Sequence, residues 1–325
     1  MVEKQDFLEE LMRLPAIYGG ALSPNGRNLA LMMLRVHENL DVFNIPVAPT
    51  DDGPVFEQME PLTKTPELTE FCDWFKDSRS VLVSEDRGGD ERAVLYRVYL
   101  NKPGEMERLT EENPPFFIKG GSVSPCGRYI YYSANYDFDS LQILEESLVL
   151  KHDLQTRKVK TLAHPEKPDY VVPSLNKAGT HLLYTRKELD PAGTQLWMVD
   201  SEGLTDRCLF QFGPKAKVEG TWLADSKNVV FETDTADGQL LNSLNIGILD
   251  IETGETRWLV DSRVDRKNIE LFIVPDIGDR IVLLEIAEAK TKAHILDVHT
   301  MEQTTVPCKK GSLIPYHPLE NGWWL

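Results

Sequence analysis

The sequence predicts an all-β fold, a β-propeller of four-stranded antiparallel blades. Three observations predict it: a Ser-Pro-x-Gly type of turn recurs along the chain, apolar and β-branched residues follow every copy, and the copies are almost evenly spaced. In the clearest copy, "SVSPCGRYIYYSAN" from Ser122, Pro125 presets φ for a turn and Gly127 tolerates a positive φ. The residues that follow, Tyr129 to Tyr132, suit a half-buried pleated strand.

Residues 1–18 precede the repeats, and we expect them to form a short helix and a lead-in. In "QDFLEELMRL" the apolar residues recur at helical spacing, and Pro15 ends the pattern. The apolar stripe consists of Phe7, Leu8, Leu11 and Leu14. An isolated helix of about ten residues is only marginally stable in water. We therefore expect this stripe to dock on the propeller or on a separate domain.

Residues 19–310 contain the six repeats. The first apolar residue after each turn serves as an anchor, and the anchors are Leu29, Val81, Ile130, Leu182, Val229 and Ile281. Successive anchors are separated by 52, 49, 52, 47 and 52 residues. The second half of a repeat, as in "IGILDIETGETRWLV" from Ile246, alternates apolar and polar residues on both sides of a polar turn. Four antiparallel strands in roughly 40–50 residues are typical of one propeller blade.

Residues 311–325 end in "HPLENGWWL", which has the form of the opening strands of a seventh repeat. Leu325 follows Gly322 by three residues, the same offset that separates the anchor from a glycine in four of the repeats. Two alternatives remain open. These strands either begin a seventh blade or close a ring of six.

The chain is acidic, with 35 Lys and Arg residues against 52 Asp and Glu residues and a formal net charge of −17. This charge disfavours nucleic acids and anionic membranes as partners. No stretch has the roughly 18 apolar residues of a spanning helix, and the start lacks a basic region followed by an apolar core. We therefore expect a cytoplasmic protein.

The residue types needed for cofactor, metal or nucleophilic chemistry do not form a recognisable pattern. The four cysteines, Cys72, Cys126, Cys208 and Cys308, form no CxxC pair, and the seven histidines form no H-x-x-x-H or HExxH pair. We expect no metal and no cofactor. A G-x-S-x-G nucleophile elbow is also absent: only Ser122 has a glycine two positions before it, and Ser124 stands where the second glycine is needed.

Two segments, "DFLEELMRLPAIYGGALSPNGRNLAL" and "VSEDRGGDERAVLYRVYL", are similar to the N-terminal propeller of the prolyl oligopeptidase family of serine peptidases, nearest its acylaminoacyl-peptidase branch. The resemblance extends from Asp6 to Leu325. It implies that the propeller caps an α/β-hydrolase domain, which carries the catalytic triad. The cap would admit short peptides and exclude folded proteins, and this chain by itself would be inactive.

The "EDRGGDE" segment is the most specific part of the resemblance. Its Gly-Gly pair suits a tight loop, across which Asp86, Arg87, Asp90 and Glu91 can form ion pairs. The alternative is that Arg87, Asp90 and Glu91 contact the substrate or the partner domain.

Glu145 and Glu146 lie in a segment that we place between the second and third strands of blade three. The dipeptidyl-peptidase branch of the same family uses a glutamate pair to hold the amino terminus of a peptide, where two carboxylates share the ammonium donors. The resemblance therefore makes this pair a candidate substrate contact. The alternative is that it only flanks the third strand.

Two function classes follow. In the first, the chain is the substrate-gating, non-catalytic propeller of a peptidase and works only with a hydrolase domain. In the second, it is a stand-alone scaffold of the TolB-like type, whose propellers share the same turns, and it binds another protein on one face.

Overall fold

The computed structural model describes residues 16–34, 39–48, 54–112, 114–167, 169, 171–236, 239–261, 269–274, 278–287, 290–308 and 315. Within these residues the chain forms 24 strands in six four-stranded sheets, together with one 3₁₀ turn. The fold is all-β, a β-propeller with six four-stranded antiparallel blades, which confirms the predicted fold class. No helix in this part of the chain is long and apolar enough to cross a membrane.

The chain divides into two compact units. One comprises Met1–Tyr136 with His152–Lys158, and the other comprises Asp137–Lys151 with Val159–Leu325. Blades one and two belong to the first unit, blades four to six belong to the second, and the division passes through blade three. The regular repeat over residues 19–310 gives no sign of this division in the sequence.

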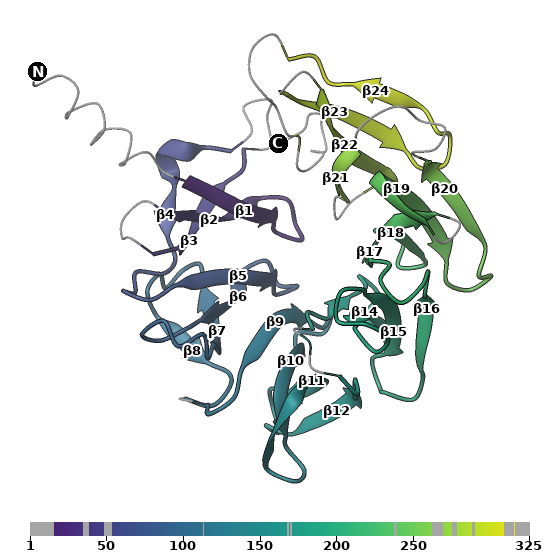
Figure 1. Cartoon of the computed structure of the whole chain (residues 1–325). Helices are drawn as coiled ribbons and strands as arrows, with labels where there is room; N and C mark the ends of the chain where they lie inside the picture. Colours follow the sequence, from purple (N-terminus) through teal and green to yellow (C-terminus); the bar gives the residue numbers. More distant parts are fainter. Residues whose placement is uncertain are drawn as a thin grey trace, which may run out of the picture. The chain divides into compact units, whose positions relative to one another are not determined.

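The strands of the first three blades follow one another across each sheet in chain order (Figure 1). Blade one contains β1 (Ala16–Leu22), β2 (Asn28–Leu34), β3 (Asp41–Pro46), the 3₁₀ turn η1 (Phe56–Gln58) and β4 (Glu60–Pro61). Blade two contains β5 (Thr69–Trp74), β6 (Ser80–Glu85), β7 (Val94–Tyr99) and β8 (Met106–Arg108). Blade three contains β9 (Ile118–Val123), β10 (Tyr129–Asp137), β11 (Gln142–Asp153) and β12 (Val159–Ala163).

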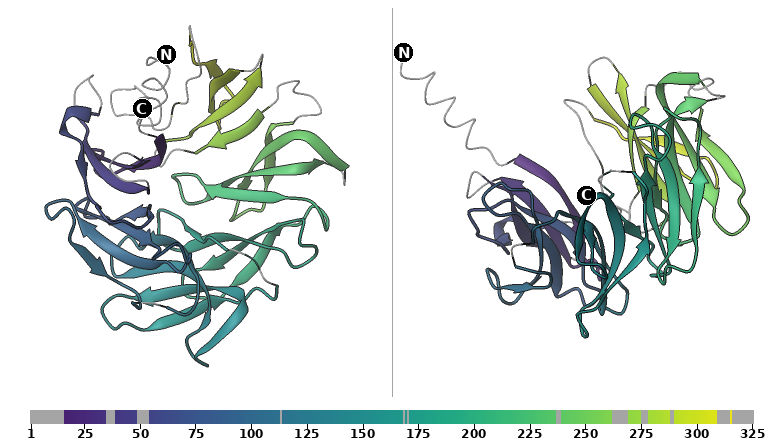
Figure 2. Two further views of the ribbon diagram at one scale, coloured as in Figure 1. Left: turned by 60° about the vertical axis from the view of Figure 1, so that its left-hand side comes forward. Right: turned by 60° about the horizontal axis from the view of Figure 1, so that its bottom comes forward.

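The last three blades repeat this order, and the strands of each blade stay together in the two further views of Figure 2. Blade four contains β13 (Ser174–Leu175), β14 (His181–Arg186), β15 (Gln195–Asp200) and β16 (Asp206–Phe210). Blade five contains β17 (Val218–Trp222), β18 (Asn228–Ala236), β19 (Gln239–Asp250) and β20 (Thr256–Val260). Blade six contains β21 (Ile269–Ile273), β22 (Arg280–Ala287), β23 (Lys290–Asp297) and β24 (Gln303–Thr305).

The structure tests the predicted start of the propeller but not its predicted end. The first strand begins at Ala16, three residues before the boundary placed at residue 19, because Ala16 and Ile17 already pair with Leu34 and Met33. The predicted helix lies outside the described residues, with its stripe of Phe7, Leu8, Leu11 and Leu14. Residues 311–325 also lie outside them, apart from Pro315. The choice between a seventh blade and ring closure therefore stays open.

The six anchor residues all lie on the second strand of their blade and are buried. Leu29 is 8% exposed, and the other five are fully covered. In blades one, two, three, four and five the anchor pairs directly with the last residue of the first strand, as Val81 does with Trp74. The turn thus places an apolar side chain at the same position of each blade, which is why the sequence interval is so regular.

The turn between the first two strands has one geometry in the described blades, although its sequence varies. The first turn residue accepts a hydrogen bond from the N–H of the fourth, as in Ser23 and Gly26, Ser124 and Gly127, and Asn176 and Gly179. These three glycines have φ values of 69°, 70° and 75°. In blades two and five the same place is taken by Ser78 and Ser226, with φ values of 56° and 61°. A serine at positive φ is strained, so a compensating interaction is expected there.

Both serines form a hydrogen bond to the turn of the preceding blade. Ser78 Oγ accepts from the N–H of Asn25 at 3.1 Å, and Ser226 Oγ accepts from the N–H of Ala178 at 2.9 Å. The serine side chain therefore contributes a link between neighbouring blades that glycine cannot provide, which offsets its backbone strain.

The same two blades carry a second link, made by tryptophan. Trp74 Nε1 donates to the carbonyl oxygen of Ala21, and Trp222 Nε1 donates to the carbonyl oxygen of Ser174, both at 2.9 Å. The segments "WFKDS" and "WLADS" thus share a W-x-x-D-S pattern that joins blade two to blade one and blade five to blade four.

Apolar side chains fill the space between neighbouring blades within each unit. In the first unit, Ala30 and Val42 of blade one pack in one cluster with Val81 and Val83 of blade two. In the second unit, one cluster joins blades four and five, and another joins blades five and six. The blades that the serine and tryptophan hydrogen bonds join therefore also share an apolar core.

Candidate functional site

The Arg87 loop connects β6 and β7 at the end of blade two. Gly88, Gly89 and Glu91 have positive φ values of 63°, 69° and 60°, which confirms the tight loop expected from the Gly-Gly pair. The N–H of Gly88 donates to Glu67 Oε2 at 2.7 Å. The loop is therefore fixed by a carboxylate that comes from outside it.

Arg87 does not form the ion pairs predicted across its own loop. Its Nη2 donates to Tyr96 Oη at 2.7 Å, and its Nη1 lies 3.8 Å from Glu112. The hydrogen bond to Tyr96 is the main reason that the pKa of Arg87 is raised. The side chain of Arg87 thus reaches Tyr96 on β7 instead of the far side of its own loop.

The three acidic residues of this loop have other roles. Asp90 accepts from the N–H of Arg92 at 2.9 Å and lies 3.5 Å from its guanidinium, and Asp86 accepts from the N–H of Leu68 at 3.3 Å. Glu91 is exposed. The predicted cluster is therefore wrong in its pairing. Arg87, with 42% of its side chain exposed, remains accessible to a substrate or a partner domain.

Glu145 and Glu146 lie within β11, not in a loop before it. Consecutive residues of a strand point to opposite faces of the sheet, so the two carboxylates cannot converge on one ammonium group. Glu146 Oε1 accepts from His164 Nε2 at 2.9 Å, and this hydrogen bond is the main reason that the pKa of Glu146 is lowered. The structure favours the alternative in which this pair belongs to the third strand.

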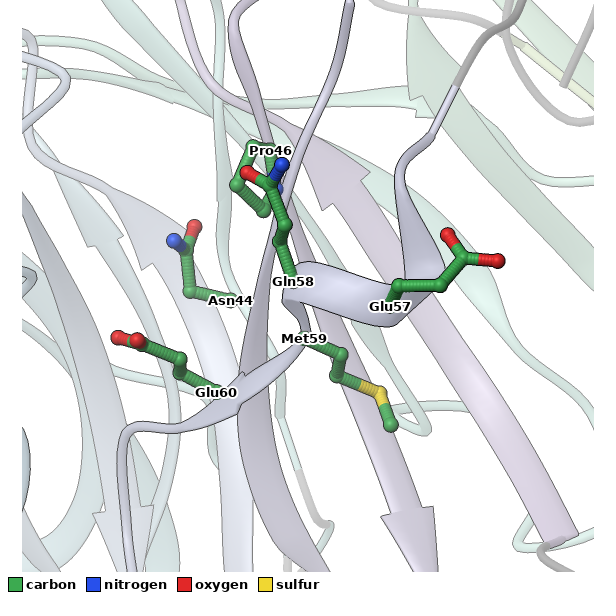
Figure 3. Close-up of a pocket in the computed structure, with 6 residues that line it drawn as sticks. All are labelled: Asn44, Pro46, Glu57, Gln58, Met59 and Glu60. Atoms are coloured by element: carbon green, nitrogen blue, oxygen red, sulfur yellow. The ribbon is translucent and has the colours of Figure 1, made fainter.

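One shallow pocket, of about 480 Å³, lies beside η1 and β4 of blade one. Its lining residues are Asn44, Pro46, Glu57, Gln58, Met59 and Glu60. Figure 3 shows that Glu57 and Glu60 point in different directions. The two carboxylates thus do not face a common ligand, and the pocket is a polar hollow without a convergent set of groups.

A buried charged cluster on blade four is the first feature that the sequence did not reveal. Arg186, 6% exposed, lies 3.8 Å from the ring centre of Trp197, and its Nε donates to Tyr184 Oη at 3.0 Å. Asp206 accepts from both Arg186 and Tyr184. Burial and the bond to Asp206 raise the pKa of the Tyr184 hydroxyl. The cluster keeps a buried guanidinium paired, as a buried charge requires.

Three polar atoms beside this cluster have no hydrogen-bond partner within the described residues. They are Glu188 Oε2, Gln195 Nε2 and Trp197 Nε1. A sequence signal did exist, since Tyr184 and Arg186 are two residues apart on β14 and therefore share one face of the strand. Alternation is also the pattern of an ordinary half-buried strand, so it does not identify a charged cluster.

A pair of carboxylates on blade five is the second unforeseen feature. Glu219 on β17 and Glu232 on β18 are directly opposite each other across the two strands. Burial, with the negative charge of Glu219 as a smaller cause, raises the pKa of Glu232 to about 7. Because the two residues are 13 positions apart in the sequence, only the register of the strands reveals the pair.

Metal-binding groups do not gather in the part of the chain that the structure describes: no three His, Cys, Asp or Glu side chains there are arranged to hold an ion. Cys72, Cys126 and Cys208 are free, and Cys126 and Cys308 are exposed.

No protein-family model and no curated protein matches the sequence. Among solved structures, the chain is similar to a prolyl endopeptidase with a TM-score of 0.67 at 14% identity, over 92% of this chain and 44% of that one. It is similar to TolB from Acinetobacter baumannii with a TM-score of 0.54 at 17% identity, over 92% of this chain and 64% of that one. It is also similar to an oligogalacturonate lyase in complex with manganese, with a TM-score of 0.64 at 12% identity, over 88% of this chain and 75% of that one.

At these identities the similarity establishes the fold, and the fold defines the class: the chain is a β-propeller of the type found in TolB and in prolyl oligopeptidases. The chain spans less than two thirds of the TolB structure and less than half of the endopeptidase structure.

Proposed function

We propose that this chain is the substrate-gating, non-catalytic propeller of a prolyl oligopeptidase-family peptidase, nearest the acylaminoacyl-peptidase branch. In this role it takes part in peptide hydrolysis only together with an α/β-hydrolase domain. The observation that carries the proposal is the coverage of the endopeptidase match: 92% of this chain aligns, but only 44% of the peptidase does. The alignment thus takes in almost the whole propeller and leaves more than half of the peptidase outside it.

The "EDRGGDE" segment supports the peptidase more than a general propeller. It forms a fixed loop at one end of blade two, and it presents a half-exposed Arg87 that Tyr96 and Glu112 hold in place. A guanidinium positioned in this way suits a peptide carbonyl or a carboxylate of the partner domain.

The absence of a nucleophile elbow from the sequence fits the same role. Ser122, the only serine preceded by glycine at the required position, belongs to β9 and pairs with Tyr131 on β10. A serine paired within an antiparallel strand lacks the sharp strand-to-helix turn that exposes a nucleophile. We therefore assign peptide hydrolysis to a separate domain and substrate gating to this chain.

The second candidate is a stand-alone TolB-like scaffold that binds another protein on one propeller face. The similarity to TolB, which also covers 92% of this chain, supports it. Its TM-score of 0.54 against 0.67 for the endopeptidase is the reason that we place it second.

The test is the coding sequence after Leu325, followed by an activity assay. The gating proposal expects a downstream G-x-S-x-G, and the continuous protein should cleave short acyl-aminoacyl or proline-containing peptides but leave folded proteins intact. A stop codon directly after Leu325 would overturn the gating proposal. In that case, capture of a specific protein by residues 1–325 would support the scaffold.

We further propose a cytoplasmic location and short peptides as the molecules that pass the gate. The free cysteines Cys72, Cys126 and Cys208 support a reducing compartment. Alkylation of these three thiols in protein taken directly from its natural cells is the corresponding measurement, and a disulfide at any of them would contradict this location.

A further inference from the structure

Blade six contains a chain of three side chains in which a hydroxyl, an imidazole and a carboxylate are linked by hydrogen bonds. His294 Nδ1 lies 2.9 Å from Thr305 Oγ1, and His294 Nε2 lies 2.8 Å from Glu285 Oε2. The three residues come from three adjacent strands, β24, β23 and β22. We propose that they form an acyl-transfer site for small activated esters, with Thr305 as nucleophile and His294 as general base.

The strand register explains why these side chains meet. His294 is directly opposite Thr305 on β24 and opposite Leu283 on β22. Glu285 follows Leu283 by two residues, so it lies on the same face of the sheet as His294. The N–H of Val306 donates to the carbonyl of Ala293 at 2.9 Å. The next pair, His294 and Thr305, is therefore a non-hydrogen-bonded pair, in which side chains come closest.

The hydrogen bonds determine the tautomer of the histidine. An ionised Glu285 can only accept, so neutral His294 carries its proton on Nε2 and donates it to Glu285. Nδ1 is then the acceptor for the hydroxyl of Thr305. This is the order of groups that activates a hydroxyl: a nucleophile bonded to a base, and the base oriented by a carboxylate. Glu285 acts through His294 and is a positioning residue.

The three side chains differ in how much of each is exposed to solvent. His294 is 4% exposed and cannot reorient easily, and the Glu285 side chain is 17% exposed. Thr305 is exposed on β24, the last strand of its sheet. The nucleophile is thus open to solvent while its base is held in place by the protein.

The backbone offers a donor for the charge that develops during acyl transfer. Because Thr305 occupies a non-hydrogen-bonded pair, its N–H points away from β23 toward the outer edge of the sheet. An N–H on the nucleophilic residue itself is a suitable donor for an oxyanion.

In the first step, Thr305 Oγ1 attacks the acyl carbon while its proton passes to His294 Nδ1. The bond between the acyl carbon and the leaving oxygen breaks, and the leaving group takes that proton. In the second step, His294 accepts a proton from water, the hydroxide attacks the Thr305 ester, and Thr305 recovers its hydrogen. The overall reaction converts an ester and water into an acid and an alcohol, and it needs no further reactant.

The probe is p-nitrophenyl acetate, applied to the full chain at pH 7.5, with acid quenching and peptide mapping by mass spectrometry. We expect acetylation of Thr305 to be about 100-fold faster than that of Thr304, the adjacent exposed threonine whose side chain lies on the opposite face. Thr305→Val should abolish the adduct, whereas Thr304→Val should not change it.

The variants His294→Gln and Glu285→Gln test the relay itself. His294→Gln should slow acetylation of Thr305 about 100-fold. Glu285→Gln should also slow it, because the imidazole loses the carboxylate that orients it, and acetylation of Thr304 should keep its wild-type rate in both variants. Thermal melts identify any variant that does not fold, and Thr305→Ser, which keeps the hydroxyl, should retain or increase the rate.

Equal acetylation of Thr305 and Thr304 would overturn the proposal. So would a Thr305 rate that rises in proportion to hydroxide concentration in both wild type and His294→Gln. Either result would mean that the three hydrogen bonds only tie the strands of blade six together. Neither result bears on the gating role, because in that role a separate domain hydrolyses the peptide and the ester site of blade six takes no part in peptide hydrolysis.

Discussion

Replacement of Glu232 by glutamine should stabilise the protein at high pH and leave its stability at low pH unchanged. The carboxyl is partly buried on blade five, its Oε2 has no hydrogen-bond partner within the described residues, and it is opposite Glu219. Its pKa is therefore raised from 4.5 to about 7. A carboxyl with a raised pKa in the folded state contributes full stability below pH 4.5, and this contribution is lost as the pH rises through 7.

The magnitude follows from the size of this change in pKa. At 1.36 kcal/mol per pH unit, a rise from 4.5 to about 7 corresponds to at most about 3 kcal/mol. Because the carboxyl is only partly shielded from water, we expect about 1–2 kcal/mol. Glu232→Gln should therefore unfold at a higher urea concentration than wild type at pH 8.5, and at the same concentration at pH 4.5.

Two control variants separate the causes. Glu219→Gln removes only the neighbouring charge, the smaller cause, so its gain at pH 8.5 should be smaller. Glu255→Gln changes an exposed glutamate on the same blade and should give no gain that depends on pH. The reasoning would be refuted if Glu232→Gln stabilised the protein equally at pH 4.5 and pH 8.5, or not at all at pH 8.5. Either result would mean that the ionised Glu232 carboxylate does not destabilise the folded state.

The remaining predictions concern other blades. Burial, with the charge of Arg157 as a smaller cause, lowers the pKa of His152 from 6.5 to about 4. The neutral imidazole therefore contributes about 2–3 kcal/mol to the free energy of unfolding above pH 6.5, and this contribution is lost as the pH falls through 4. His152→Gln should therefore show a weaker loss of stability between pH 6.5 and 4 in urea titrations, and an unchanged acid slope would contradict this. Ser226→Ala should lower the free energy of unfolding by about 1–2 kcal/mol, because it loses the bond to Ala178 and keeps the strained φ; Ser226→Gly should lie within about 1 kcal/mol of wild type, and equal losses in both variants would argue against the strain. Arg87→Ala should shift the free energy of unfolding by less than about 1 kcal/mol, since its ion pair is exposed, but should reduce peptide turnover by the continuous peptidase; unchanged turnover would remove Arg87 from the site. Finally, a fluorophosphonate probe should label no serine of residues 1–325, and labelled Ser122 would show that a nucleophile was overlooked.

The period of the sequence predicted the fold correctly because the interactions that define a blade are local. Each turn acts over a few residues, and each anchor follows its turn directly, so Val81 and Ile130 reach the same buried position on the second strand by the same short-range geometry. The same reasoning predicted the tight loop at Gly88 and Gly89, whose positive φ is a property of those residues themselves.

The side-chain partners at the candidate sites depend on which strands pair and in which register, and this is where the sequence-based expectations diverge from the structure. Arg87 bonds to Tyr96 on the neighbouring strand β7 and not across its own loop. Glu145 and Glu146 are adjacent in sequence, but their place in β11 puts them on opposite faces.

The sequence by itself thus determined the repeated blade, its buried anchors and its turns, since these need only residues that are close along the chain. The tertiary structure alone decided which distant groups meet: Glu219 with Glu232, Glu285 and Thr305 with His294, and Ser226 with Ala178. The physical reason is that a shift of one residue in strand register sends every side chain to the other face of the sheet. Register is settled by the packing of whole strands, so no short segment encodes these encounters.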